Sequence, residues 1–259
     1  MKLLMLGLAS ALFVISPQVR ASVLLDWASV PPSQKQLEPV TSPPGPNGTY
    51  TTGSDFSNVL VTVSGSGFAP EGLHNPKIDD KGSPYSVPAL SSAADFKASG
   101  SGTPTVTFTI DFFGFKQGVK NVSFDLFNVN GKNEGGLLVE DVVTFQTAGL
   151  SLNGGADDVV SGNTVTGIAT SGPESTDEPG GDVAVHSGGL PLHQIVFTWT
   201  QNDVGSKSGN EAFLSDLAIG NITFTPVPEV GQLVIGLVAC LLGALWLHKN
   251  RRKRAHSIA

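Results

Sequence analysis

Alternating apolar and polar residues mark most of the regular structure that this sequence predicts. The clearest case is residues 105–112, which place four apolar side chains on one face: Val106, Phe108, Ile110 and Phe112. A period of two residues with one polar face indicates a β-strand. Similar runs between turns rich in glycine and asparagine predict further strands at residues 22–30, 59–63, 122–129, 137–147, 164–170, 182–186, 194–200 and 213–225.

The pattern favours an all-β fold. Away from the two chain ends, no segment keeps a helical period over eleven residues. Residues 31–48 and most of residues 65–101 are rich in proline, glycine and serine and are predicted to be loops. About ten short strands joined by tight turns predict an antiparallel β-sandwich or jelly roll.

The apolar run at residues 230–247 departs from this pattern, with Gln232 as its one polar side chain. A helix of this length just crosses the ~30 Å hydrocarbon core of a bilayer. Five basic residues follow: Lys249, Arg251, Arg252, Lys253 and Arg254. We therefore expect a single transmembrane helix, with the basic tail (248–259) in the cytoplasm and the rest of the chain outside. A buried core helix is the alternative, and the basic cluster argues against it.

The N-terminus has the features of a secretory signal peptide. Lys2 precedes a short apolar core, and Val19 and Ala21 supply the small residues expected before a cleavage site. Cleavage is therefore expected after Ala21. The sequence then divides into three parts: a signal peptide (1–21), an exported β-sandwich ectodomain (22–225) and a C-terminal anchor segment (226–259).

Val227, Pro228 and Glu229 lie directly before the apolar run. This Val-Pro-Glu motif, followed by one membrane helix and a basic tail, resembles the PEP-CTERM sorting signal of exosortase substrates. The family usually has proline after the glutamate, where this chain has Val230. The resemblance implies processing near residues 227–229 by a membrane-embedded, exosortase-like enzyme, with this chain as the substrate and not the enzyme. A generic single-pass anchor is the alternative.

Charge and cysteine content narrow the function classes. Residues 22–228 contain eight lysines, no arginine and 21 carboxylates, which leaves a net charge near −13. A nucleic-acid partner is excluded, because phosphate binding needs clustered basic residues. The single cysteine, Cys240, lies in the apolar run, so the exported part has no disulfide, no thiol nucleophile and no cysteine-based zinc site.

Oxygen-bearing side chains gather at the end of one predicted strand and in the next: Asp125, Asn128, Asn130, Glu140 and Asp141. Asp141 alternates with Val139 and Val143 and is therefore predicted to point inward, where a carboxylate needs a partner. Carboxylate and amide oxygens are the ligands that Ca²⁺ prefers, although the spacing is not that of an EF-hand. The cluster is a candidate structural Ca²⁺ site, with a metal-free polar hairpin as the alternative.

Catalytic motifs are missing from the exported part. It has no Gly-x-Ser-x-Gly, His-Glu-x-x-His or phosphate-binding loop motif. We expect His74, His186 and His193 at the surface, and we expect Asp157 and Asp158 beside a turn. A secreted hydrolase is accordingly the third interpretation of this chain.

Aromatic residues bear on carbohydrate binding. Trp27 and Trp199 share strand faces with apolar residues and are predicted to lie in the core, which leaves Tyr50 and Tyr85, in predicted loops, for stacking on a sugar. The strands near residues 122–130 and 140–147 are also similar to the lectin-like ectodomains often found before this sorting signal.

We expect a structural or adhesive cell-surface or extracellular-matrix protein. A surface-anchored carbohydrate-binding module, with extracellular polysaccharide as its partner, is the alternative.

Overall fold

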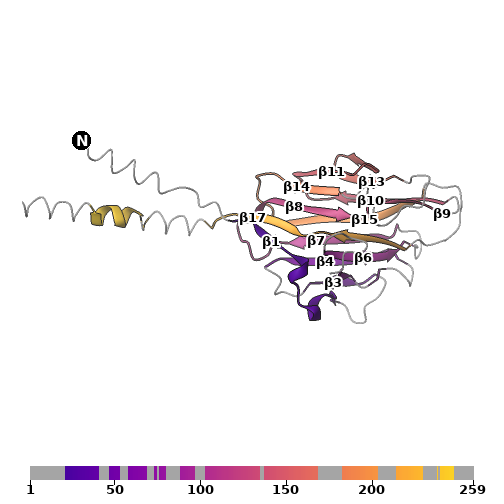
Figure 1. The fold of residues 1–259 in the computed structure, drawn as a ribbon, viewed down its shortest axis with the longest axis horizontal. Helices are drawn as coiled ribbons and strands as arrows, with labels where there is room; N and C mark the ends of the chain where they lie inside the picture. Colours follow the sequence, from indigo (N-terminus) through magenta and orange to yellow (C-terminus); the bar gives the residue numbers. More distant parts are fainter. Residues whose placement is uncertain are drawn as a thin grey trace, which may run out of the picture.

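The structure is a computed structural model of the full chain. It describes residues 21–40, 47–52, 58–68, 73–74, 76–79, 88–96, 103–134, 137–168, 183–203, 214–229, 238 and 240–247. Over these ranges the chain forms two antiparallel β-sheets, as the sequence predicts (Figure 1). Two short 3-10 helices, Trp27–Ser29 and Pro32–Gln34, follow the first strand.

The strand order of each sheet fixes which segments lie side by side. The eight-stranded sheet contains β1 (Val23–Leu25), β17 (Ile222–Pro226), β8 (Val119–Phe127), β16 (Leu214–Ile219), β6 (Ala89–Asp95) and β5 (Lys77–Asp79), with β14 (Val183–Ser187) on β8 and β11 (Leu150–Asn153) on β14. The nine-stranded sheet contains β12 (Asp158–Ser161), β13 (Thr164–Gly167), β10 (Leu137–Phe145), β15 (Gln194–Asp203), β7 (Thr105–Asp111), β4 (Leu60–Ser66), β3 (Thr49–Thr51) and β2 (Glu38–Pro39), with β9 (Gly131–Glu134) on β10.

Both sheets contribute to one hydrophobic core, which makes the fold sandwich-like. The inward residues of β7 are buried and the residues between them are half-buried, so the predicted alternation is confirmed. Phe108 and Phe197 stack within the nine-stranded sheet, with ring centroids 4.8 Å apart. Phe112, next to β7, meets Phe224 of β17 edge to face at 5.2 Å, across the two sheets. Trp199 is also fully buried, as predicted.

The strand expected at residues 22–30 is shorter than predicted, and the strand expected at residues 213–225 is interrupted. β16 and β17 both pair with β8, but Gly220 and Asn221 between them belong to neither strand. Trp27, buried as predicted, lies beyond the end of β1 and hydrogen-bonds to both residues. Its indole N–H donates to the Gly220 carbonyl at 2.7 Å, and its backbone N–H donates to Asn221 Oδ1 at 3.0 Å. The outer neighbour changes at this interruption, because β16 pairs with β6 and β17 pairs with β1.

The expectation of about ten strands is too low, because some stretches predicted as loops form strands. β6 lies inside residues 65–101 and pairs with both β5 and β16. Its sequence, Ala-Leu-Ser-Ser-Ala-Ala-Asp, consists mostly of small residues and lacks the apolar alternation of β7. Tyr50 is likewise buried in β3 and does not lie in a loop, so it cannot stack on a ligand. Such strands are specified by their neighbours in the sheet more than by their own pattern.

Several predictions concern residues outside the described ranges. These are the signal peptide before Ala21, most of the apolar run (230–237 and 239), the basic cluster with the rest of the tail (248–259), and Tyr85. Residues 240–247 are helical. Searching the described residues for a helix with the length and apolar character of a membrane span finds none.

Candidate functional site

The first and last strands of the sandwich lie beside each other. β1 and β17 are antiparallel partners, with Val23 opposite Phe224. The hydroxyl of Ser22 donates to the Phe224 carbonyl at 3.5 Å. The chain therefore enters the sandwich next to the point where it leaves it, at the end where β17 is labelled in Figure 1.

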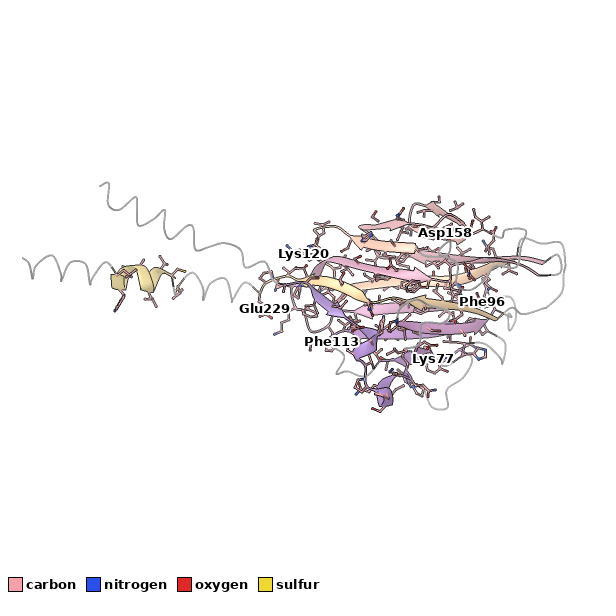
Figure 2. The ribbon with its side chains drawn as sticks, viewed as in Figure 1. Lys77, Phe96, Phe113, Lys120, Asp158 and Glu229 are labelled. Atoms are coloured by element: carbon pink, nitrogen blue, oxygen red, sulfur yellow. The ribbon has the colours of Figure 1, made fainter. Side chains whose placement is uncertain are left out.

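The Val-Pro-Glu segment begins where β17 ends. The backbone N–H of Val227 donates to the Gly118 carbonyl at 3.0 Å, and this bond holds the chain against the turn before β8. Pro228 and Glu229 belong to no strand or helix, and Glu229 is exposed at this end of the molecule (Figure 2). The segment thus lies outside both sheets and is accessible from solvent.

Three segments meet around this point, and we call them together the exit pole: residues 112–120, 188–193 and 225–229. Backbone hydrogen bonds join the first two, since Phe112 N–H donates to the His193 carbonyl at 2.9 Å and Val119 N–H to the Leu192 carbonyl at 2.8 Å. The third is joined by the pairing of Pro226 with Val119. The exit pole is therefore part of the folded core and not a loose set of loops.

A polar cluster lies between the two sheets, toward the end of the sandwich opposite the exit pole. Asp141 on β10 is 1 % exposed, which confirms its inward orientation. Ser215, from β16 of the other sheet, donates its hydroxyl hydrogen to the carboxylate, with oxygen distances of 3.0 and 3.3 Å. Gln201 Nε2 donates to Oδ1 at 3.1 Å, and the backbone N–H of Asn130 donates to Oδ2 at 3.3 Å. One buried carboxylate thus connects both sheets.

The environment of Asp141 changes its proton affinity. Burial raises the pKa of this carboxyl from 3.8 to about 6, because the ionised form is poorly solvated in the core. Gln201, Trp199, Ser215 and the Asn130 backbone N–H oppose this rise by favouring the ionised form. The Trp199 indole N–H lowers the pKa of Asp141 as a nearby polar group and not as a hydrogen-bond donor, because it has no hydrogen-bond partner. Each of these groups is neutral, so none of them offsets the cost of burying the charged form completely. The Asp141 carboxyl is therefore a core group with a pKa of about 6.

The five predicted Ca²⁺ ligands are only partly brought together. Asp141 N–H donates to the Asn130 carbonyl at 2.9 Å, and Asn130 Nδ2 donates to Asn128 Oδ1. Glu140 faces the other side of β10 from Asp141, and Asp125 is exposed on β8. The described residues contain no group of three histidine, cysteine, aspartate or glutamate side chains that could hold a metal ion. Ca²⁺ binding stays a prediction.

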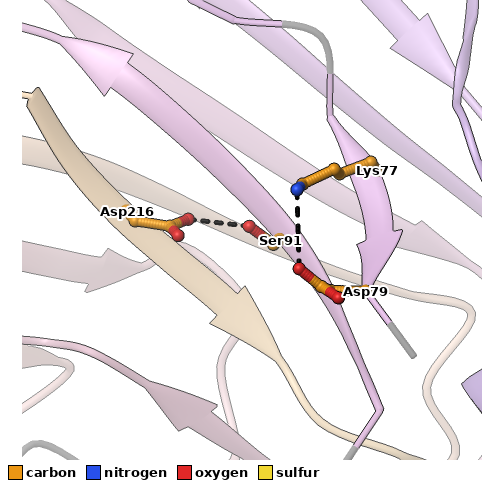
Figure 3. A network of polar contacts seen from close by, with 4 residues as sticks. All are labelled: Lys77, Asp79, Ser91 and Asp216. Atoms are coloured by element: carbon orange, nitrogen blue, oxygen red, sulfur yellow. Dashed lines mark hydrogen bonds and ion pairs between the residues drawn. The ribbon is translucent and has the colours of Figure 1, made fainter. Parts of the chain in front are cut away.

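Asn128 connects this cluster to a second polar network near the β5 edge. Figure 3 shows the Lys77, Asp79, Ser91 and Asp216 side chains of that network. The Asn128 amide donates to the Asp216 carbonyl at 2.6 Å, and Ser91 on β6 donates to Asp216 Oδ1 at 2.8 Å. Lys77 and Asp79 form an ion pair of 3.4 Å along β5. Lys77 is largely exposed, so this pair contributes little to stability. The network supports the sheet edge and offers no evident chemistry.

The remaining candidates lie at the surface. His74, His186 and His193 are exposed, as expected. Asp157 is also exposed, and Asp158 Oδ2 accepts a hydrogen bond from Gly155 N–H at 2.9 Å, which places the pair at a turn. Within the described residues, the large aromatic side chains exposed to solvent are Phe113 and Trp246, which lie far apart in the sequence. That part of the chain therefore has no exposed row of aromatic rings across a sheet.

Two partners of Asp141, Gln201 and Ser215, were not predicted from the sequence. Each occupies an inward position of its strand, with buried apolar residues two and four positions away. A polar residue at such a position predicts a buried polar partner, because buried polar groups are hydrogen-bonded. This signal, applied to β15 and β16, would have identified both residues without identifying Asp141 as their common partner.

Comparison of the chain with protein-family models, curated proteins and solved structures finds no match. Its function has to be inferred from its own residues.

Proposed function

We propose that this chain is an exported protein, held by a membrane helix over residues 230–247 and delivered to the cell surface or extracellular matrix by a C-terminal sorting signal. Residues 1–21 direct export, and the basic cluster at 249–254 keeps the C-terminus in the cytoplasm. The sandwich acts outside the cell in a structural or adhesive role. A membrane-embedded, exosortase-like enzyme is the partner of residues 227–229.

The position of the Val-Pro-Glu segment is the observation that supports this proposal most. β17 ends at Pro226, and within the described residues the last backbone hydrogen bond to the sandwich comes from Val227 N–H. Proline has no N–H, so Pro228 cannot extend the pairing. Glu229 is exposed. A processing enzyme could therefore bind these residues without unfolding the sandwich.

The mature protein is expected to begin at Ser22. β1 starts at Val23, two residues after Ala21, so removal of residues 1–21 leaves every described strand intact. Intact-mass measurement of protein from cells and medium reads both chain ends. A mass that includes residues 1–21 would contradict export through a cleaved signal peptide.

Glu229→Ala and Pro228→Ala are each expected to leave an uncut precursor in the membrane and to reduce surface delivery. Both changes alter the motif and leave the sheets and the apolar run unchanged. Expression in a host with the sorting enzyme, followed by immunoblotting of membrane and surface fractions, measures the precursor. Normal processing of both variants would refute the sorting signal.

Two controls separate sorting from folding and topology. Glu38→Ala makes the same change at an exposed glutamate on β2 and should leave processing unchanged. Replacing the five basic residues of the tail by glutamine should disturb membrane orientation whether or not residues 227–229 are a sorting motif.

A further inference from the structure

The exit pole exposes apolar side chains on a rigid base. Phe113 is 49 % exposed and Leu190 is 75 % exposed. The turn that carries Phe113 is fixed to the core, because Phe112 and Phe115 both contact the ring of the buried Phe224 with centroids 5.2 Å apart. Figure 2 shows Phe113, Lys120 and Glu229 at the same end of the sandwich. Two large apolar groups are thus presented where the chain leaves the fold.

The exit pole also differs in charge from the rest of the exported part. Lys116 is exposed on the turn before β8 and Lys120 is half-buried at the start of β8, and Glu229 is the one carboxylate within the exit pole. Residues 22–228 as a whole carry a net charge near −13. An anionic surface therefore repels the sandwich as a whole, whereas the exit pole carries two lysines and one carboxylate.

The tether between this end and the apolar run is short. Val227 is hydrogen-bonded to Gly118, so only Pro228 and Glu229 separate the fold from residue 230. A chain of this length spans at most about 10 Å from Val227 to residue 230. The headgroup layer on each side of the hydrocarbon core is roughly 5 to 8 Å thick. A helix that begins at residue 230 therefore holds the exit pole at the headgroups.

We propose that the exit pole docks on the bilayer that holds residues 230–247, with Phe113 and Leu190 in the interfacial layer and Lys116 and Lys120 against lipid phosphates. This inference rests on the proposed membrane anchor. Tethering makes the contact intramolecular, so a weak surface is sufficient. Docking fixes the depth of residues 227–229 at the interface and directs the Asp141 end of the sandwich away from the membrane.

The test uses the full chain reconstituted in vesicles of phosphatidylglycerol and phosphatidylcholine. An environment-sensitive fluorophore is attached at one cysteine: the native Cys240, or Leu190→Cys or Val159→Cys in a Cys240→Ser chain. Val159 is 50 % exposed on β12, at the end where Figure 2 labels Asp158, and serves as the distant control. Lipids with a quencher at headgroup depth and lipids with a quencher in the acyl chains report the position of each label.

Docking predicts acyl-chain quenching at residue 240, headgroup quenching at residue 190 and no quenching at residue 159. Quenching at 240 with none at 190 would overturn the docking and leave the anchor in place. No quenching at 240 would overturn the anchor itself. Phe113→Ser combined with Lys116→Glu and Lys120→Glu should reduce quenching at 190 and leave it unchanged at 240. Unchanged quenching at 190 in this variant would overturn the role assigned to these side chains.

Discussion

Replacing Phe224 by alanine is expected to lower the free energy of unfolding by about 3 to 5 kcal/mol. Phe224 is fully buried, and its ring contacts Phe112 and Phe115 of the segment that joins β7 to β8. Truncation removes apolar contacts from both sheets and leaves a cavity beneath the turn of the exit pole. For a domain of this size the melting temperature should fall by on the order of 10 °C. Thermal and denaturant-induced unfolding of the purified protein measure both quantities.

Phe113→Ala is the matched control, because it removes the same ring from the same turn at an exposed position. Its free energy of unfolding should remain within about 0.5 kcal/mol of the wild-type value. Equal destabilisation by the two substitutions would contradict the division of this turn into an anchored face and an exposed face. Retained stability of Phe113→Ala would also show that Phe113 is free to serve a surface role.

The part of the fold that could be predicted from sequence is the part with large alternating side chains. β7, β8, β10 and β15 place valine, isoleucine or an aromatic residue at most inward positions, so a period of two is visible without a structure. β6 has serine or alanine at every buried position except Leu90 and gives no such signal. Its strand conformation depends on pairing with β16, which lies more than a hundred residues later in the chain.

The candidate sites divide in the same way. The inward position of Asp141 follows from its place between Val139 and Val143, because successive side chains of a strand alternate between its two faces and the local sequence shows this alternation. Its partners Gln201 and Ser215 are 60 and 74 residues away, and the pairing of distant strands is not encoded in local periodicity. The exit pole was missed for the same reason, since its three segments meet only in the folded sheets.

Asp141 is expected to make the sandwich less stable as pH rises through about 6. Burial raises the pKa of this carboxyl from 3.8 to about 6, so the folded chain binds the proton more tightly than the unfolded chain between these values. The stabilisation is fully present below the unfolded value and is lost above the folded value. Its full size is about 3 kcal/mol, from 1.36 kcal/mol for each pKa unit. Other carboxylates add their own pH dependence, so the contribution of Asp141 has to be measured against a variant.

Asp141→Asn is that variant. Its amide oxygen can accept from Asn130 N–H and Ser215, and its NH₂ group can donate to Gln201 once the glutamine amide turns over. The variant should be at least as stable as the wild type at pH 8. Between pH 8 and pH 5 the wild type should gain on the order of 1 to 2 kcal/mol relative to the variant. Denaturant unfolding of both proteins across this range measures the difference, and identical pH dependence would contradict an ionisable Asp141 in the core.

Calcium binding at Asp141 would reverse the sign of this dependence. Ca²⁺ binds the ionised carboxylate, and a ligand specific to the native state stabilises it by about 2.7 kcal/mol at a hundredfold excess over Kd. Stability would then rise with pH in added Ca²⁺, EDTA would lower the melting temperature of the wild type, and Asp141→Asn would be insensitive to both. If the carboxylate binds only a proton, EDTA changes neither protein and the wild type still loses stability as pH rises. The pH slope with and without Ca²⁺ therefore distinguishes a metal ligand from a buried proton-binding group, because burial favours the neutral carboxyl and a bound cation favours the charged one.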